Sequence, residues 1–317
     1  MQPEQSAIVT CSYGPDEQRC RRLCRSIDRF VPDAVEHCLI VPRRDYPRFR
    51  DLERGRRRVC ITEEVVPGPF RRLPLTDKWW LSANGWPVRG WIMQQITKLS
   101  ANHAVAAEHI LFADSDIEFI RPLDTALFVR EGRLRLHRVP GAASKGRHLL
   151  WHQRAGALLG LEPHYFGSDY VGQLITWRRS RLVALQHHLE QVSGAPWYRP
   201  IARSLHFSEY ILYGVFVEHV VGEEQAGHFY CADDICHCCW FAADAERLRN
   251  GTAAISDRTQ AFGSMSIVRF TRTSGLPLTT ACGSLSRRYQ HSPGRIGTGV
   301  PFRRNVTASG ETIGTVR

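Results

Sequence analysis

The sequence predicts an α/β protein built on a doubly wound, mostly parallel β-sheet with helices on both faces. Short apolar segments alternate with amphipathic segments along the first 120 residues, at the period of strand–helix–strand units. Polar or turn-forming residues follow each apolar segment, as they do where parallel strands end at a common edge. A chain of 317 residues, 43% of them hydrophobic, is long enough to form one large α/β domain.

The first half of the chain supplies most of the expected sheet. A strand is expected over residues 6–13, ending at Gly14-Pro15, and apolar residues at helical spacing from Cys20 to Phe30 predict a helix. The elements expected next are a strand (36–41), a polar helix and turn (45–58), a strand (59–62), an irregular loop rich in Pro and Gly (67–90) and a helix (91–107).

The segment around Asp114-Ser115-Asp116 carries the clearest chemical signal. An apolar strand over 110–113 leads directly into it. Residues two apart in an extended segment point to the same side, so the two carboxylates repel each other unless a cation or a hydrogen-bond donor lies between them. Mg²⁺ and Mn²⁺ meet that need, because they prefer oxygen ligands and share them with a diphosphate. Ordinary turn residues at a strand end are the alternative interpretation.

The second half is expected to elaborate this sheet. A strand over 170–177 contains Gly172, which indicates close approach of backbone or ligand. Ser208 is a suitable N-cap for a buried helix over 208–217. The other expected elements are a strand (117–120), a turn (123–128), a strand exposed on one face (134–139), a basic loop (140–148), helices (151–159 and 182–192) and short pieces at 253–256 and 265–267.

Charge and cysteine content limit the function classes. The net charge of +11 comes from scattered arginines without an aromatic-interleaved basic block, so no nucleic-acid partner is expected. A basic chain also suits a nucleoside diphosphate or an anionic membrane surface, and peripheral membrane contact stays open. Without a leader or a long apolar span, we expect a soluble, cytoplasmic protein with reduced cysteines. The cysteines from Cys231 to Cys239 lack the spacing of structural zinc sites, and we expect buried thiols there, although metal binding stays open.

Several segments, in this order, resemble GT-A-fold glycosyltransferases, and more specifically a largely uncharacterised bacterial group of glycosyltransferase-like proteins. The similarity covers roughly residues 6 to 240. The segments are Thr10-Cys11-Ser12-Tyr13, Gly90-Trp91 with Gln94-Gln95 and Lys98, Asp114-Ser115-Asp116, Gly172-Gln173-Leu174-Ile175-Thr176-Trp177, and Ser208-Glu209-Tyr210 with Tyr213-Gly214.

The resemblance implies transfer of a sugar from a nucleoside diphosphate sugar, with a uridine diphosphate sugar as the expected donor. The acceptor is a glycan, a lipid-linked glycan or a small molecule. The implied organisation is one GT-A-like catalytic domain over 1–283, with a nucleotide-binding half (1–122), an acceptor-side half (123–283) and a C-terminal elaboration. A composition rich in Ser, Gly, Arg and Thr predicts a flexible or ligand-ordered tail over 284–317.

The resemblance also assigns roles to residues. Mn²⁺ or Mg²⁺ is expected at Asp114 and Asp116, with His237 completing the metal ligands and His228 as the second choice. The residues expected to bind the donor are Thr10, Ser12, Tyr13, Gln94, Lys98 and Asp114. Glu209 is the first candidate for a catalytic base or nucleophile, and Asp169 is the second; whether the anomeric configuration is retained or inverted is left open.

Each assignment has a plainer alternative. Lys98 equally suits a solvated helix lysine, and Glu209 suits a first-turn carboxylate favoured by the helix dipole. A nucleotidyltransferase or phosphotransferase could use a similar sheet, although no Gly-x-x-x-x-Gly-Lys-Ser/Thr loop is present. A basic, non-enzymatic protein that binds nucleic acid or a membrane surface is the other alternative.

Overall fold

The computed structural model describes residues 5–74, 76, 78–82, 85–239, 246–247, 256 and 258–264. Apart from residue 256, the short pieces expected at 253–256 and 265–267 lie outside these residues, as does the expected tail over 284–317. In this part of the chain, no helix combines the length and the apolar character needed to cross a membrane.

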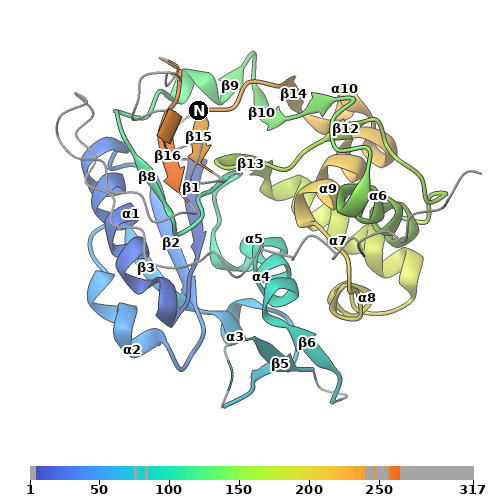
Figure 1. The fold of residues 1–317 in the computed structure, drawn as a ribbon, viewed down its shortest axis with the longest axis horizontal. Helices are drawn as coiled ribbons and strands as arrows, with labels where there is room; N and C mark the ends of the chain where they lie inside the picture. Colours follow the sequence, from blue (N-terminus) through green and yellow to red (C-terminus); the bar gives the residue numbers. More distant parts are fainter. Residues whose placement is uncertain are drawn as a thin grey trace, which may run out of the picture.

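A five-stranded central sheet organises the molecule, with the strand order β13-β7-β1-β2-β3 (Figure 1). β1 runs parallel to both of its neighbours, and β2 runs parallel to β3, whereas β13 at the edge is antiparallel to β7. The strands are β1 (Ser6–Cys11), β2 (Glu36–Val41), β3 (Arg57–Ile61), β7 (His109–Phe112) and β13 (Ile175–Arg178). The predicted mostly parallel, doubly wound α/β fold is therefore confirmed.

Alternating side chains of the central strands pack against helices on both faces of the sheet. Ile8 of β1 packs with Leu23 and Ile27 of α1 (Glu17–Phe30) on one face. Val9 points the other way and joins the larger core, which includes residues of the helices on the right of Figure 1. These helices are α4 (Gly90–Leu99), α5 (Ala101–Ala104), α7 (Arg179–Ser193) and α9 (Glu209–Val215).

The winding of the chain reverses at β1. From β1 the chain passes outward to β2 and β3, and it then returns through α4 and α5 to β7 on the other side of β1. In open α/β sheets, ligands bind in the crevice outside the carboxyl ends of the strands that flank such a reversal. Here the corresponding place is at the carboxyl ends of β1 and β7, where residues 12–16 and 113–116 follow the two strands, and we call it the β1/β7 crevice.

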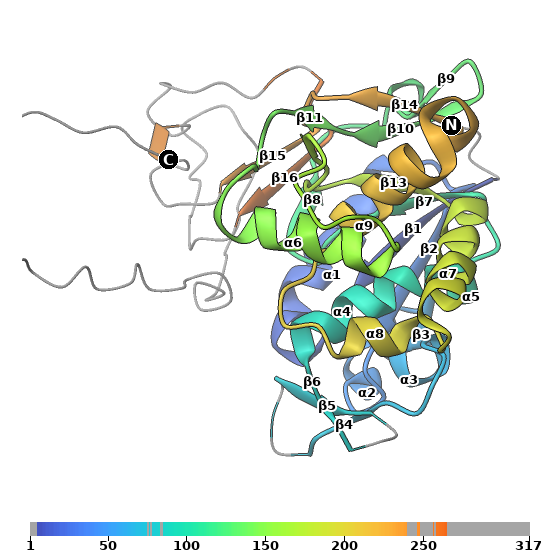
Figure 2. The ribbon, with the colours of Figure 1, turned by 90° about the vertical axis from the view of Figure 1, so that its right-hand side faces the viewer.

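The prediction of an irregular loop over 67–90 is wrong, because this segment contains a small three-stranded antiparallel sheet. Strands of two or three residues are too short to show a period-2 pattern, and Pro and Gly between them mask the pairing. Trp80 pairs with Val88, and both are buried. Figure 2 shows this sheet projecting below the rest of the molecule. Its strands are β4 (Arg71–Arg72), β5 (Trp79–Leu81) and β6 (Pro87–Arg89).

Two other expected elements are interrupted. The helix over 91–107 stops at Ser100, whose hydroxyl donates to the carbonyl of Ile96, and it resumes as the short helix α5. The strand expected over 170–177 forms only from residue 175, as β13, and the two-residue strand β12 (Ser168–Asp169) precedes it. Leu174 lies between these strands with φ = 53°, a left-handed conformation that a continuous strand does not allow.

The two remaining differences from the predictions are the burial of one strand and the shortening of one helix. β10 (Arg133–His137) is not exposed on one face as predicted, because its residues 134–137 are all buried. Arg135 is accommodated there because its guanidinium donates to the carbonyl of Asp233. The polar helix over 45–58 is reduced to the turns α2 (Tyr46–Phe49) and η3 (Arg50–Leu52).

Smaller sheets and helices complete the fold. β10 lies between β9 and β14, β16 lies between β8 and β15, and β11 pairs with β12. The bounds are η2 (Gly14–Asp16), α3 (Thr62–Val65), β8 (Ile117–Phe119), η4 (Thr125–Leu127), β9 (Val129–Arg130), β11 (Val139–Pro140), α6 (Gly146–Leu158), α8 (Tyr198–Ala202), the π-helical η5 (Phe216–Gly222), α10 (Glu223–Ala226), β14 (His228–Cys231), β15 (Cys236–Cys239) and β16 (Ala261–Ser264).

Gly214 tests the packing of α9, because a Cβ at this position would lie 2.3 Å from the ring of Tyr170. We expect Gly214→Ala to lower the free energy of unfolding by roughly 3 kcal/mol through overpacking, measured by chemical denaturation. In a Tyr170→Leu background the same substitution should cost much less, since the ring is gone. An equal cost in both backgrounds would contradict this contact.

Candidate functional site

A buried group of charged side chains lies at the β1/β7 crevice. Nζ of Lys98, near the end of α4, is 3.0 Å from Oδ1 of Asp114, which follows β7. The same ammonium is 3.2 Å from Oε1 of Glu209 in the first turn of α9. Lys98 is 4% exposed and Glu209 is 5% exposed, so this is a desolvated ion cluster that joins three elements.

Local structure fixes the position of Glu209. Ser208 is the predicted N-cap of α9, and its hydroxyl accepts a hydrogen bond from the backbone N–H of Ile211. The backbone N–H of Glu209 donates to Oε1 of Gln95, at 2.9 Å. Because Gln95 and Lys98 lie on the same helix, α4 holds both the backbone and the carboxylate of Glu209.

Tyr210 completes the surroundings of Lys98. The ammonium donates to the Tyr210 hydroxyl at 2.7 Å and lies 4.6 Å from the centre of its ring. Burial by itself would lower the pKa of Lys98, but Asp114, Tyr210 and Glu209 raise this pKa well above its ordinary value. Burial raises the pKa of Glu209, and the charge of Lys98 opposes that rise. Lys98 is therefore a fixed cation in an apolar setting.

A second group of carboxylates faces this cluster. Burial, and then the charge of Asp114, raise the pKa of Asp116 to about 6. Burial also raises the pKa of Asp16 to about 7; Arg19 opposes this rise, and Asp116 and Asp114 add to it. Nη1 of Arg19 lies 3.2 Å from Oδ1 of Asp16. Negative charge thus accumulates at the ends of both β1 and β7.

The described residues contain no group of three His, Cys, Asp or Glu side chains placed to share a metal ion. Mg²⁺, however, commonly takes one or two protein carboxylates and completes its coordination with water and substrate phosphates. Burial and the charge of Asp114 both raise the pKa of Asp116, so a bound cation would be favoured next to Asp116. Asp114 and Asp116 therefore fit a Mg²⁺ or Mn²⁺ ion that is bound together with a diphosphate.

The two histidines expected near the metal differ in their surroundings. His237 lies on β15, where its ring stacks on Phe262 at 5.8 Å. His228 uses both ring nitrogens, Nε2 with the Tyr213 hydroxyl at 2.9 Å and Nδ1 with the carbonyl of Leu134 at 3.0 Å. It thus has no nitrogen left for a metal, and the assignment of His228 as second-choice ligand is wrong in this arrangement.

The residues expected to bind the donor are only partly brought together. Tyr13 is at the crevice, where the guanidinium of Arg72 lies 5.8 Å from its ring centre. Ser12 is buried at the end of β1, and Gln94 is partly exposed on α4. The Thr10 hydroxyl points to the opposite face of the sheet, 3.2 Å from Nε2 of His37, so we leave Thr10 out of the donor site.

Asp169, the second catalytic candidate, is outside the Lys98 cluster. Its Oδ1 accepts a hydrogen bond from the backbone N–H of Val171, and its Oδ2 is 3.6 Å from Nδ1 of His148. The Asp169 side chain is 17% exposed, compared with 7% for that of Glu209. Asp169 and His148 thus form a separate, more accessible acid–base pair.

Sequence reasoning did not identify Asp16, Arg19 or Gln173 as candidate functional residues. Asp16 and Arg19 resemble ordinary first-turn residues of α1, and only the fold brings them close to Asp116. Gln173 immediately precedes Leu174, and its Oε1 is buried without a hydrogen-bond partner in the described structure. Left-handed backbone at a non-glycine residue often marks functional sites. The Gly172-Gln173 pair before an apolar strand was the one available signal.

Comparison with known protein families gives a family for this chain. A family model described as "Family of unknown function (DUF6492)" matches residues 7–252, and the chain belongs to this family. No curated protein sequence matches the chain.

Two solved structures of LgtC are similar. An active-site mutant shares 12% identity at a TM-score of 0.43, covering 82% of this chain and 87% of that one. The galactosyltransferase LgtC in complex with donor and acceptor sugar analogues shares 10% identity at a TM-score of 0.42. This match covers 85% of this chain and 91% of that one.

Lys98→Met tests the ion cluster. The variant leaves Asp114 and Glu209 buried without their cation, which should cost about 3–5 kcal/mol of folding stability at neutral pH. Losing the charge of Lys98 also raises the folded-state pKa of Glu209 further above its unfolded value. Protonation of Glu209 then stabilises the folded variant at low pH. This contribution is lost as the pH rises through the folded-state pKa of Glu209.

Urea denaturation of wild type and variant between acidic and neutral pH measures this effect. Lys145→Met, at an exposed position, is the matched control and should change stability by less than about 0.5 kcal/mol. A Lys98→Met deficit that is small, or that does not grow with pH, would disprove the assigned role of the cluster.

Proposed function

We propose that this member of the DUF6492 family is a glycosyltransferase that binds a nucleoside diphosphate sugar in the β1/β7 crevice. The observation that carries the proposal is the desolvated Lys98, held between Asp114 and Glu209 at the point where the sheet reverses its winding. A purely structural core rarely keeps such groups, because taking charges out of water is costly. Strongly perturbed, buried titratable groups in a crevice are typical of active sites.

The carboxylates at this crevice suit a metal-bound diphosphate. Asp114 and Asp116 are the proposed ligands of Mg²⁺ or Mn²⁺, which supplies positive charge for the leaving diphosphate when bound. Lys98 fixes the orientation of Asp114 through their ion pair. It also adds a permanent positive charge beside the crevice, without a cost of reorientation during the reaction.

The nucleoside is proposed to bind beside Ser12 and Tyr13, at the carboxyl end of β1. This is the strand end where open α/β sheets bind nucleotides. A uridine diphosphate sugar is our proposed donor, and this detail rests on the family resemblance. His237 stays a proposed additional metal ligand.

The two candidate catalytic carboxylates can be assigned different roles. Transfer breaks the bond from the anomeric carbon to the diphosphate oxygen, forms a bond to an acceptor oxygen, and releases the acceptor's proton to a base. Glu209 is buried and paired with Lys98, so we propose that it positions this cation. Asp169, more accessible and close to His148, is the better candidate for the base.

Donor turnover tests the function directly. Sugar nucleotides incubated with the protein and Mn²⁺ should release nucleoside diphosphate slowly by hydrolysis, even without an acceptor, and fastest for the true donor. We expect Asp169→Asn to abolish transfer to an acceptor while leaving donor affinity unchanged. Release of nucleoside diphosphate from no sugar nucleotide would contradict the proposal. Its release only from nucleoside triphosphates would favour a phosphotransferase, and release of pyrophosphate from them would favour a nucleotidyltransferase.

Ligand-induced stabilisation tests the donor site. A ligand at about 100 times its Kd that binds only the folded protein adds about 2.7 kcal/mol to its stability. We expect uridine diphosphate with Mn²⁺ to raise the melting temperature of the wild type by several degrees. The double variant Asp114→Asn with Asp116→Asn should lose this shift, since it lacks the proposed metal ligands.

The matched control is Asp33→Asn with Asp51→Asn, two exposed carboxylates away from the crevice. It should keep the full shift. A shift that the Asp114/Asp116 variant retains, or one that does not require the metal, would overturn the proposed diphosphate site.

A further inference from the structure

A shallow hollow lies between the small β4–β6 sheet and α8, separate from the β1/β7 crevice. Its volume is about 40 Å³, far below the roughly 300–1,000 Å³ of pockets that enclose small ligands. Trp86, in the turn between β5 and β6, is 60% exposed. We call this the hairpin–α8 surface; its lining residues are Pro69, Phe70, Ser82, Trp86, Tyr198, Arg199, Ala202 and Arg203.

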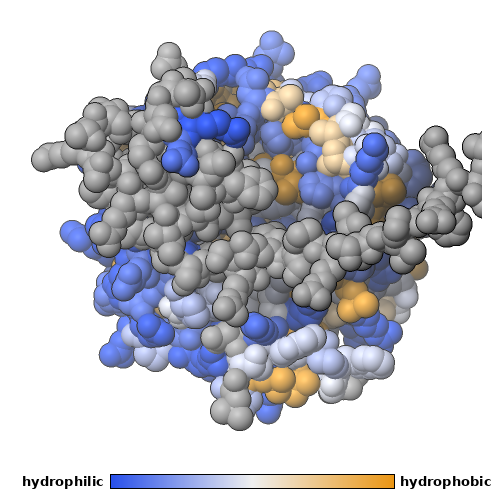
Figure 3. Space-filling view, in the orientation of Figure 1, coloured by the Kyte–Doolittle hydropathy of each residue, from blue (hydrophilic) through white to orange (hydrophobic). Residues whose placement is uncertain are grey.

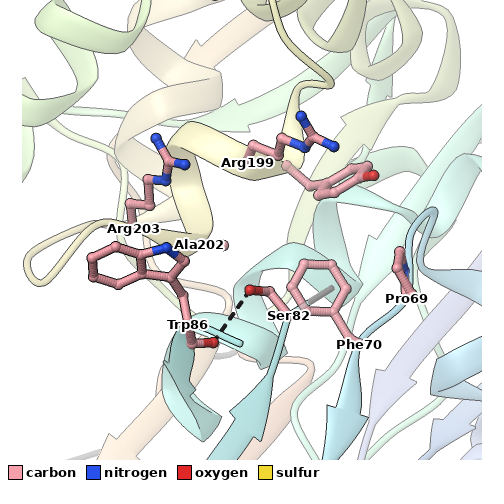
Figure 4. A pocket seen from close by; sticks show the side chains of 8 residues that line it. Pro69, Phe70, Ser82, Trp86, Arg199, Ala202 and Arg203 are labelled. Carbon is pink, nitrogen blue, oxygen red and sulfur yellow. Dashed lines mark hydrogen bonds between the residues drawn. The ribbon is translucent and has the colours of Figure 1, made fainter. Parts of the chain in front are cut away.

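The aromatic rings of this surface lie beside arginines. Figure 4 shows Phe70 and Trp86 on one side of the hollow and Arg199 and Arg203 on the other. The rings of Phe70 and Tyr198 pack edge to face at 5.5 Å, which joins the small sheet to α8. The indole of Trp86 extends beyond this contact into solvent.

The described residues of this surface carry positive charge. Arg199 and Arg203 are exposed one helical turn apart, and Arg71, Lys78 and Arg89 are exposed on or next to the small sheet. The described residues of segments 67–90 and 197–206 include no Asp or Glu. An anionic partner is therefore favoured electrostatically.

The side-chain chemistry favours a lipid surface over a carbohydrate. Proteins commonly bind sugar hydroxyls through carboxylate and carboxamide side chains. Among the described residues that line the hollow, the uncharged hydrogen-bonding side chains are those of Ser82, Tyr198 and Trp86. Exposed Trp at the depth of the headgroups, with Arg around it, is the usual composition of an interfacial anchor. Leu205, two residues after Arg203, is 68% exposed and adds apolar area. Figure 3 also shows apolar residues at the lower edge of the molecule, where Figure 1 places β5 and α8.

The surface is connected to the proposed active site. Nη1 of Arg72 on β4 lies 2.7 Å from Oδ2 of Asp45, and this guanidinium also approaches Tyr13 at the crevice. β6 ends at Arg89 and α4 begins at Gly90, so no linker separates the small sheet from the helix that carries Lys98. The ten residues of α4 span about 15 Å.

We infer that the hairpin–α8 surface docks this protein on a bilayer containing anionic phospholipids, with Trp86 at the headgroup level and Arg199 and Arg203 against the phosphates. This inference goes beyond the proposed function and does not depend on it, because docking requires no turnover and none of the residues of the crevice.

Vesicle flotation tests the inference on the full chain. The probes are vesicles of phosphatidylcholine alone and of phosphatidylcholine mixed with phosphatidylglycerol. We expect the wild type to float with the mixed vesicles only, and less so at high salt. Trp86→Ala should reduce binding severalfold, and Arg199→Gln with Arg203→Gln should reduce it about tenfold, since each cation near an anionic surface adds to the affinity.

A control variant on another surface shows whether the loss of vesicle binding is specific to Arg199 and Arg203. Arg25→Gln with Arg29→Gln removes two exposed charges that are also one turn apart, on α1. This control should bind vesicles within about twofold of the wild type, because its charges lie outside the docking surface. Circular dichroism and melting temperature verify that each variant is folded.

Three results would overturn the inference: no wild-type binding to either kind of vesicle, equal losses in the two arginine pairs, or undiminished binding by both the Trp86 and the Arg199/Arg203 variants. Binding to a soluble anionic polysaccharide but not to vesicles would also overturn it and would identify a glycan surface instead. If the Trp86 and Arg199/Arg203 variants lose vesicle binding but keep the nucleotide-dependent thermal shift, docking is supported as a property separate from the donor site.

Discussion

The ion cluster around Lys98 is the interaction on which the rest of the functional site depends. It requires α4, the end of β7 and the start of α9 to meet within hydrogen-bond distance, although their residues are distant in the sequence. Removing the charges from water is costly, and the mutual attraction repays the cost only when the geometry is good. The cluster therefore penalises every arrangement of these elements except the one observed.

The same cluster makes the two carboxylates of the Asp114-Ser115-Asp116 segment different from each other. Asp114 is already paired with a cation, whereas Asp116 and Asp16 lie close to Asp114 and have raised pKa values. The carboxylates next to the crevice are thus unequal: Asp114 is paired with Lys98 and Asp16 with Arg19, whereas Asp116 has no ion pair among the described residues. An added cation would therefore be most strongly attracted to the side of Asp116.

The sequence was sufficient where the pattern is local. β1, β2, β7 and the Ser208 cap were all predictable, because buried strands and capped helices have distinct periods and end signals. The small sheet over 71–89 was not, since its strands are too short to have a period. The expectation for Thr10 depended on the orientation of its side chain, which bonds His37 of the neighbouring strand β2. The two partners of Lys98, Asp114 and Glu209, follow it in the chain by 16 and 111 positions. No local sequence pattern identifies both of them.

The edges of the central sheet have a consequence for the behaviour of the chain in solution. β13 has only four residues, and the hydroxyl of Thr176 bonds the carbonyl of Arg135 on β10 beside it. At the other edge, β3 presents Arg58, whose guanidinium binds Glu36 and the carbonyl of Ala104. Short edge strands, a covering strand and charged side chains all obstruct pairing with another chain. A sheet with so apolar an interior is thereby protected against edge-to-edge aggregation.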